Sequence, residues 1–533
     1  MKLLLLLSIA SSFSYIYAEI VQVDFDIYRA NSFDSIGDSE NNRKGAYLIK
    51  RDGVDGVAEM EIMNMQTFYM VEILLGSNQN SQNVLIDTGS SDLWVMSHEV
   101  TCLATRRKRD TTFNVFKDKQ IVSPNLNNQN QPQDQNLVQN QPRDEIDEFS
   151  DDIDDEGKWG IFTTIWATQT SGPGVATGLP AASNTCTQYG SFDTGDSTSF
   201  KRNSSTPDFQ ILYADGTSAS GIWGTDTLVF GNTTVNNFSF AVANRTSSDV
   251  SVFGIGLPAL QVTTQYGITY ANLPIKLRED GTIAKAAYSV FLGSSTATSG
   301  TILFGGVDHA KYTGDLVTMP IISLTSGPPN RLLARVNSIS LNSSSNSVVV
   351  TSNLYSANLD TGSTLSYFPK SLLNSLVSAL GGGSGTSQGY TVVKCPSSNQ
   401  FMSINFSGRV VQVPLTDLVL SYRGTCLLGV IEQSSSSSYI LFGDNVLRSM
   451  YVVFDLDDLE ISIAQASYSK NTNIEAIGKS VPSAVPAASY SNTQISSGAT
   501  ENPKSTLNDS TTYHVPKSLF LSILSIVFGM III

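Results

Sequence analysis

Apolar residues along the chain fall into short runs rather than into helical spacing. TFYMVEILLG (67–76), NVLIDTG (83–89) and DLWVM (92–96) follow one another closely, and FQILYADGTSASGIWGTDTLVF (209–230) holds two such runs around a polar turn. YVVFDLDDLEISIAQA (451–466) alternates in the same way. Short apolar or alternating runs bounded by Gly, Asp and Ser are typical of β-strands. The pattern predicts a mostly β protein.

One tetrapeptide occurs twice at the end of such a run. It is Asp87-Thr88-Gly89-Ser90 in the first half of the chain and Asp360-Thr361-Gly362-Ser363 in the second. A single copy is weak evidence, because Asp and Gly are ordinary turn residues. Two copies, each after apolar residues and a lobe's length apart, indicate an internal duplication. Two such loops facing each other would place both carboxylates in one site.

Paired carboxylates have a characteristic chemistry. Two of them within hydrogen-bonding distance hold one proton between them, because both cannot ionise cheaply. The ionised member can take a proton from a water that attacks a carbonyl, and the protonated member can donate to the carbonyl oxygen. The alternative is a pair of unrelated Asp-Gly turns. If the pair is functional, activity should peak at acid pH and fall as the second proton is lost.

DTGSSDLWV (87–95) and LDTGSTLSYF (359–368) resemble the active-site loops of the pepsin-like aspartic proteases, and the chain is most similar to their yapsin branch of surface-anchored fungal enzymes. The resemblance covers about residues 65–466. It implies a bilobal, all-β fold with the active site in the cleft between two related lobes, and no cofactor or metal. It implies Asp87 and Asp360 as catalytic residues, and these as their support: Thr88, Gly89, Ser90, Thr361, Gly362 and Ser363. SVFGIGLP (251–258) and SYILFGDNVL (438–447) resemble the family's elements that buttress each catalytic loop.

The resemblance also identifies residues 209–230 as the flap, a hairpin that closes over substrate. Tyr213 takes the position of the flap tyrosine, whose phenol is expected to hydrogen-bond to Trp94. Asp215 and Gly216 follow at the tip, where Tyr-Ala-Asp-Gly departs from the commoner Tyr-Gly-x-Gly. Two interpretations of Asp215 stay open: recognition of Lys or Arg beside the scissile bond, as yapsins prefer, or an Asx-turn that stabilises the hairpin.

Charge and composition narrow the possible functions. The formal charge of −15 disfavours nucleic acid as a partner and suits an acidic medium or a cationic substrate. The three histidines have no metal-ligand spacing, and no HExxH, P-loop or GxSxG occurs. Metal-dependent and Ser-His-Asp hydrolysis are therefore poorly supported.

The chain is long enough for more than one domain and begins with segments that suggest a secreted precursor. Residues 1–18 have the pattern of a signal peptide, whose apolar run is too short for a membrane anchor. Residues 19–51 are polar and end in Lys50-Arg51, so we expect a propeptide cut after Arg51; a plain surface basic pair is the alternative. The two lobes are then expected at 52–310 and 311–466.

The first lobe carries an expected disordered insert at about 103–185, which is rich in Asn and Gln and then acidic. Its Arg106–Arg109 run is either a processing site, with the cut after Arg109, or an uncut loop. Four cysteines in a secreted chain fit two disulfides. We expect Cys102–Cys186 and Cys395–Cys426, the pairs nearest in sequence, and the resemblance agrees. The first would keep two cleaved chains joined; the enzyme is otherwise expected to be a monomer.

Six sequons precede the C-terminal region and predict a glycosylated surface: Asn203, Asn232, Asn237, Asn244, Asn342 and Asn405. Residues 467–508 have a Ser/Thr-rich stalk composition. Residues 509–533 end in an apolar tail with no basic residue after it, which is typical of a glycosylphosphatidylinositol (GPI) signal. We expect lipid attachment at Asn508, or at Ser510 as second choice; a retained tail anchor is the alternative.

Together these features predict an aspartic endopeptidase at the outer face of the plasma membrane or in the cell wall. Its expected partners are protein or peptide substrates with basic residues, and the resemblance implies processing or shedding of surface proteins. The rival hypothesis is a catalytically silent wall protein that binds peptides or glycans in the same cleft.

Overall fold

The computed structural model of this protein describes most of the chain between residues 69 and 490. It describes residues 69–104, 186–214, 217–297, 300–344, 346–387, 390–422, 424–433, 437–488 and 490, with the backbone of short strands at 20–24, 27–28, 57–58, 62–65 and 179–180. The predicted signal peptide, most of the predicted insert, the predicted cleavage sites Arg51 and Arg109 and the predicted lipid-attachment site Asn508 lie outside these residues.

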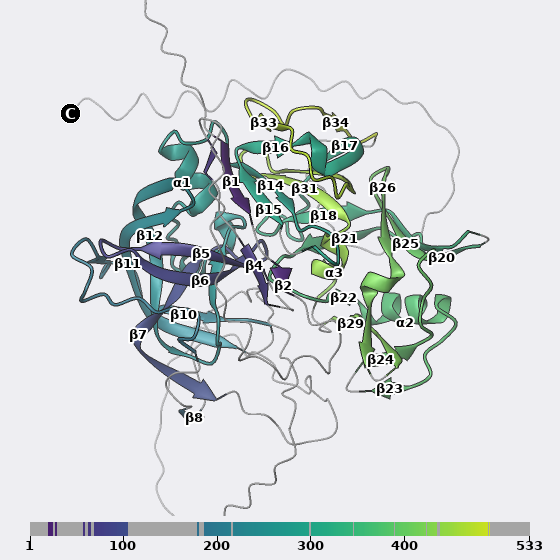
Figure 1. Ribbon diagram of the computed structural model, residues 1–533, viewed down its shortest axis with the longest axis horizontal. Coiled ribbons are helices and arrows are strands. Elements are labelled where there is room, and N and C mark those ends of the chain that lie inside the picture. Colours follow the sequence, from purple (N-terminus) through teal and green to yellow (C-terminus); the bar gives the residue numbers. More distant parts are fainter. Residues whose placement is uncertain are drawn as a thin grey trace, which may run out of the picture. The chain divides into compact units, whose positions relative to one another are not determined.

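Strands dominate the described residues, and the first catalytic loop belongs to the largest sheet (Figure 1). Along the sheet the strands are β10 (Phe209–Leu212), β11 (Ser218–Phe230), β12 (Thr233–Thr246), β7 (Leu93–Ala104), β13 (Ser251–Gly254), β6 (Asn80–Asp87), β5 (Tyr69–Leu75), β4 (Ile62–Met65) and β2 (Ile27–Tyr28), with β8 (Leu179–Pro180) on β7 and β9 (Lys201–Arg202) on β11. Burial alternates along most of β11, because one face of this strand packs on the core.

The second half forms three smaller sheets, and the first of them carries the second catalytic loop. It is β18 (Leu333–Val336), β21 (Tyr355–Leu359), β30 (Ile440–Phe442), β22 (Ser366–Phe368) and β29 (Val430–Glu432). The others are β20 (Ser347–Thr351), β19 (Ser338–Asn342), β25 (Phe401–Phe406) and β26 (Arg409–Pro414), and β23 (Thr386–Ser387), β24 (Tyr390–Val393), β28 (Thr425–Leu428) and β27 (Val419–Tyr422). The α-helices among the described residues are short: α1 (Leu273–Glu279), α2 (Lys370–Ala379) and α3 (Asp444–Leu447).

An eight-stranded sheet joins the two halves. Its order is β3 (Val57–Ala58), β1 (Ile20–Asp24), β15 (Thr301–Phe304), β14 (Ala287–Phe291), β31 (Met450–Asp455), β32 (Glu460–Ala466), β17 (Tyr312–Pro320) and β34 (Ala484–Pro486). Every residue of β14 and β31 is buried, because both faces of this part of the sheet are covered. Strands from both sides of the predicted lobe boundary at residue 310 therefore share one sheet, as Figure 1 shows for β14, β15 and β31.

The predicted start of the stalk at residue 467 is wrong. Residues 467–488 pack on the body: β33 (Ile474–Ala476) pairs with β16 (Gly306–Asp308), and β34 pairs with β17. Ile477 is fully buried, and Val481 and Ala487 are nearly so. The Ser, Pro and Asn content of this segment suggested a stalk, but a few well-placed apolar residues and two backbone ladders hold it in place.

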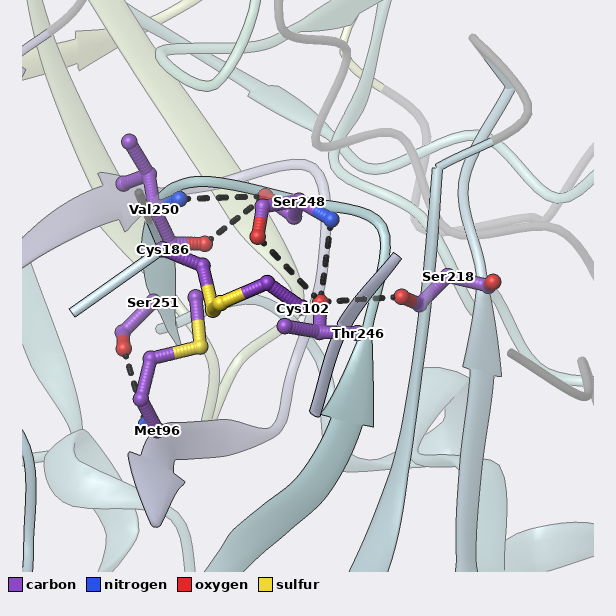
Figure 2. Close-up of a disulfide and its surroundings, with 8 residues drawn as sticks. All are labelled: Met96, Cys102, Cys186, Ser218, Thr246, Ser248, Val250 and Ser251. Atoms are coloured by element: carbon purple, nitrogen blue, oxygen red, sulfur yellow. Dashed lines mark hydrogen bonds between the residues drawn. A yellow bond between two sulfur atoms is a disulfide. The ribbon is translucent and has the colours of Figure 1, made fainter. Parts of the chain in front are cut away.

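Both predicted disulfides are present, with Cα–Cα separations of 5.8 Å for Cys102–Cys186 and 5.2 Å for Cys395–Cys426. Figure 2 shows the first beside the turn of residues 246–251, in which Thr246 Oγ1 donates to the Ser218 carbonyl at 3.0 Å. Cys102 lies two residues before the end of β7, and Cys186 follows the predicted insert, so this bond joins the two ends of the insert. Nowhere in the described part of the chain is a helix both long and apolar enough to cross a membrane.

Candidate active site

Each catalytic loop begins where a buried strand ends. β6 ends at Asp87, and β21 ends at Leu359, one residue before Asp360. A parallel partner supports each strand, with Gly254 of β13 opposite Asp87 and Phe442 of β30 opposite Leu359. Because the two halves repeat this arrangement, both loops leave their sheets in the same way.

A glycine lies at the end of each supporting strand, Gly254 as the last residue of β13 and Gly443 directly after β30, because the loop packs directly on its backbone. A Cβ atom at Gly254 would lie 2.4 Å from the Ser91 nitrogen, and one at Gly443 would lie 2.3 Å from the Ser363 carbonyl oxygen. No side chain fits in either place. Residues 251–258 and 438–447, which the sequence predicts as supports of the two loops, therefore bring backbone against backbone beneath each loop.

Two threonines brace the loops against each other. The Thr88 N–H donates to Thr361 Oγ1 at 3.1 Å, and the Thr361 N–H donates to Thr88 Oγ1 at 3.0 Å. Each hydroxyl in turn donates to the opposite strand, Thr88 to the Leu359 carbonyl at 2.7 Å and Thr361 to the Ile86 carbonyl at 2.9 Å. All four groups are buried, so the exchange ties the two halves together at the site.

The two carboxyl groups meet at this brace. A Cβ atom at Gly89 would lie 2.6 Å from Asp360 Cγ, so only glycine allows the second carboxylate to approach the first loop. The Gly89 N–H donates to Asp87 Oδ1 at 2.7 Å, and the Gly362 N–H donates to Asp360 Oδ1 at 2.9 Å. Ser90 Oγ donates to Asp87 Oδ2, and Ser363 Oγ donates to Asp360 Oδ2 at 3.1 Å.

The environment favours one shared proton. Asp87 and Asp360 are both 0% exposed. Burial raises the pKa of Asp87 well above its usual range, and the negative charge of Asp360 and the hydrogen bond between the carboxyls raise it further. The ionised carboxylate of such a pair can accept a proton from a water while the protonated carboxyl donates to a substrate carbonyl. This arrangement is suited to general acid–base hydrolysis of an amide.

The flap hairpin stands beside the first loop. β10 and β11 pair in antiparallel register, and the Tyr213 N–H donates to the Thr217 carbonyl at 2.8 Å across the turn. Trp94 Nε1 donates to the Tyr213 hydroxyl at 2.7 Å, which is the contact expected from the sequence. Asp215 and Gly216 lie outside the described residues.

Sequence reasoning missed a buried carboxylate in the same loop. Asp92 is 0% exposed, and it accepts hydrogen bonds from the Tyr270 hydroxyl at 2.7 Å and the Val262 N–H at 3.0 Å. Burial and Asp92 raise the pKa of Tyr270 well above its usual range, so its phenol stays a donor. The Tyr270 ring packs edge-on against Trp223 of the flap strand β11, with centroids 5.4 Å apart. Nothing in the sequence pairs residues 178 positions apart.

One group of acidic side chains in the described residues lies close enough to hold a cation. It consists of Asp455, Asp458 and Glu460. The Lys285 ammonium already bridges two of them, at 2.6 Å from Asp455 and in a shorter contact with Asp458. Lys285 and Asp455 form a buried ion pair at one side of this cluster, and the exposed Asp458 shares the same ammonium, so the cluster already holds a cation.

The predicted glycosylation sites differ in exposure. Asn203, Asn232, Asn237 and Asn244 are exposed, whereas Asn342 and Asn405 are half-buried. Asn342 Nδ2 donates to Ser403 Oγ at 2.6 Å. The first four therefore present their amides to an attached glycan more openly than the last two.

Comparison with known proteins agrees with this geometry. Residues 68–130 and 163–466 match the eukaryotic aspartyl protease family. The chain is 43% identical to secreted aspartic protease 9 of Candida albicans over 487 residues, covering 86% of this chain and 87% of the relative. It is 37% identical to aspartic proteinase 3 of Saccharomyces cerevisiae over 501 residues, covering 89% and 83%. It is 32% identical to yapsin-3 of the same yeast over 470 residues, covering 85% and 77%.

With two Asp-Thr-Gly-Ser loops braced around a buried carboxyl pair, and with these relatives along most of its length, the chain belongs to the eukaryotic aspartyl protease family and is an aspartic-type endopeptidase.

Proposed function

We propose that this endopeptidase cleaves protein substrates at Lys or Arg residues and processes or sheds proteins at the cell surface and wall. The observation that carries the catalytic part is the pair Asp87 and Asp360, whose carboxyls meet between the two braced loops. Asp87 and Asp360 hold the attacking water, Thr88 and Thr361 fix the loops, and Ser90 and Ser363 tune the carboxyls.

The basic preference rests on Asp215. In the sequence Asp215 comes two residues after Tyr213, whose hydroxyl accepts a hydrogen bond from Trp94 Nε1. A carboxylate there would attract a cationic side chain next to the scissile bond.

We also propose a precursor that matures at basic sites and stays attached to the membrane. Removal of residues 1–18 and 19–51 would leave a chain beginning at Asp52, and a GPI lipid on Asn508 would hold it. The same proposal includes N-linked glycans and, if the insert is cut after Arg109, two chains joined by Cys102–Cys186.

The first experiment is cleavage of a peptide library containing Lys and Arg, from pH 3 to 7. The secreted form should end after residue 490 rather than 466, because β33 and β34 belong to the body. Acid-favoured cleavage at basic residues, absent in Asp87→Asn, is the expected result. No cleavage after complete removal of residues 19–51 would favour the peptide-binding wall protein instead.

Specificity is tested by replacing Asp215 with Thr. The substitution should lower cleavage at Lys and Arg and leave cleavage at Leu peptides unchanged. An unaltered preference for basic residues would assign Asp215 to the hairpin turn alone.

Anchoring is tested on the full-length chain in cells. Phosphatidylinositol-specific phospholipase should release the enzyme from the membrane fraction, and Asn508→Gln with Ser510→Leu should prevent lipid attachment. Retention in the membrane fraction after phospholipase treatment would support an uncleaved C-terminal anchor.

A further inference from the structure

Adjacent basic residues occur at four places in the chain: Arg43-Lys44, Lys50-Arg51, Arg106–Arg109 and Lys201-Arg202. The first three lie outside the described residues. The fourth lies on the described catalytic body, where it forms β9. It is also the one pair followed at once by a glycosylation sequon, Asn203-Ser204-Ser205.

This fourth pair is open to solvent. Both residues of β9 are exposed, and the Arg202 side chain is 60% exposed and forms a long ion pair of 3.9 Å with Asp208, which is also exposed. The segment 203–208 that follows has no regular secondary structure and is largely exposed. A protease that cleaves at Lys or Arg would therefore have an accessible cleavage site within its own folded chain.

Only a short ladder holds the pair on the sheet. Lys201 and Arg202 lie opposite Thr225 and Gly224 of β11, and the Asn203 N–H donates to the Trp223 carbonyl at 2.9 Å. Local opening of a two-residue edge strand requires little free energy compared with global unfolding. The backbone pairing alone is weak protection against cleavage.

We propose that an N-linked glycan on Asn203 shields the bond between Arg202 and Asn203 from proteolysis, including cleavage of one copy of this enzyme by another. The self-cleavage part rests on the proposed preference for Lys and Arg. In that reaction water would add a hydroxyl to the Arg202 carbonyl carbon and a proton to the Asn203 nitrogen as the bond breaks. A branched oligosaccharide on the residue after the scissile bond would prevent entry into a cleft that a flap must close.

The local geometry accepts the glycan. The Asn203 side chain is exposed, its Nδ2 donates to Thr206 Oγ1 at 2.9 Å, and its Oδ1 accepts from the Ser205 N–H at 3.0 Å. A glycosylated asparagine keeps one amide N–H and its carbonyl oxygen, so both hydrogen bonds can persist. The turn that presents Asn203 is thus compatible with the modified residue.

The test compares two substitutions at Ser205 in the secreted form of the enzyme that ends after residue 490. Ser205→Ala destroys the sequon, whereas Ser205→Thr keeps it. Alanine preserves the turn, because the bond to Asn203 uses the backbone N–H of residue 205. Mass spectrometry should find a glycan on Asn203 in the wild type and Ser205→Thr but not in Ser205→Ala.

On incubation at acid pH, Ser205→Ala should lose full-length chain and gain a new N-terminus at Asn203, while Ser205→Thr stays intact. Residue 202 lies outside both disulfide loops, 102–186 and 395–426, so these pieces separate on a gel without reductant. A cut after Arg109 lies inside the first loop, and its pieces separate only after reduction. The two cleavages are therefore distinguishable.

Three further experiments identify the cleaved bond, the protease that cleaves it and the effect of the glycan on an unrelated protease. Adding Lys201→Gln and Arg202→Gln to Ser205→Ala should restore resistance, and adding Asp87→Asn should do so if the cleavage is self-inflicted. Trypsin serves as a protease of independent basic specificity. Suppose that trypsin cleaves after Arg202 in Ser205→Ala but not in Ser205→Thr, while the enzyme does not cleave itself in either variant. This result would support the glycan shield and contradict the proposed preference of the enzyme for Lys and Arg. An unoccupied Asn203, or resistance of the glycan-free protein to both enzymes, would overturn the shield.

Discussion

The two catalytic loops are alike for four residues and different afterwards. In both, the Asp carboxyl accepts from the glycine N–H two residues later and from the serine hydroxyl three residues later. Both threonines make the same pair of bonds across the site. The duplicated tetrapeptide therefore builds a nearly symmetric acid–base pair.

From the sixth residue onward, counted from the catalytic aspartate, the two loops make different contacts. Asp92 and Trp94 in the first loop hydrogen-bond to Tyr270 and to the flap residue Tyr213. Leu365, at the position equivalent to Asp92, instead packs in an apolar cluster with Tyr367 and Leu441. The comparison indicates that the acid–base chemistry comes from the tetrapeptide that both halves share. Attachment of the flap comes from Asp92 and Trp94, which only the first loop has.

The largest expected effect tests the shared part. Asp87→Asn and Asp360→Asn should each lower kcat/KM by roughly 10²–10⁴-fold or more, because either change removes one member of the acid–base pair. Peptide hydrolysis at acid pH measures both. A large loss in one variant beside near-normal activity in the other would contradict the shared role.

The next effect concerns the glycines beneath the loops. Gly254→Ala and Gly443→Ala should each lower the free energy of unfolding by about 3 kcal/mol, because the new Cβ meets backbone atoms that cannot move aside. Denaturant unfolding measures the loss. Gly281→Ala is not a suitable control because of its positive φ, whereas Gly327→Ala meets only a side-chain atom at 3.6 Å and should cost far less.

A smaller effect is expected from the brace. Thr88→Ala and Thr361→Ala should each cost about 1–2 kcal/mol of stability, since each leaves a buried N–H of the opposite loop without its acceptor. Thr→Ser at the same positions keeps the hydroxyl and is the matched control. The double alanine variant should cost less than the sum of the singles, because the bonds belong to one network; strict additivity would argue against the brace.

The smallest effect tests the asymmetric part. Tyr213→Phe removes the acceptor for the buried Trp94 Nε1–H, so it should lower stability by about 1 kcal/mol and, because the phenol belongs to the flap, should also lower kcat/KM about fivefold. Tyr270→Phe should lower stability by a similar amount, because Asp92 stays buried with one donor fewer, but should leave kcat/KM nearly unchanged. Equal effects of the two variants on both quantities would remove the distinction between flap and support.

Local patterns allowed prediction of those parts of the site that repeat in the sequence. The catalytic aspartates follow apolar runs that are recognisable strands, and the two disulfides join neighbouring cysteines. The contact between Asp92 and Tyr270 was not predictable, because it depends on how distant loops fold together. Residues 467–488 were misjudged for a related reason: their strands form only by pairing with β16 and β17, and their composition carries no sign of those partners.

The most direct test of the shared proton is thermal unfolding of the wild type and Asp87→Asn across acid to neutral pH. The folded-state pKa of Asp87 is raised above its unfolded value by burial and by Asp360. Its contribution to stability is therefore fully present below the ordinary aspartate pKa and is lost as pH rises through the raised value. Because asparagine stays neutral, the Tm of Asp87→Asn should increasingly exceed that of the wild type towards neutral pH, with little difference in acid. A Tm difference that stays constant across this range would contradict a carboxyl pair that shares one proton.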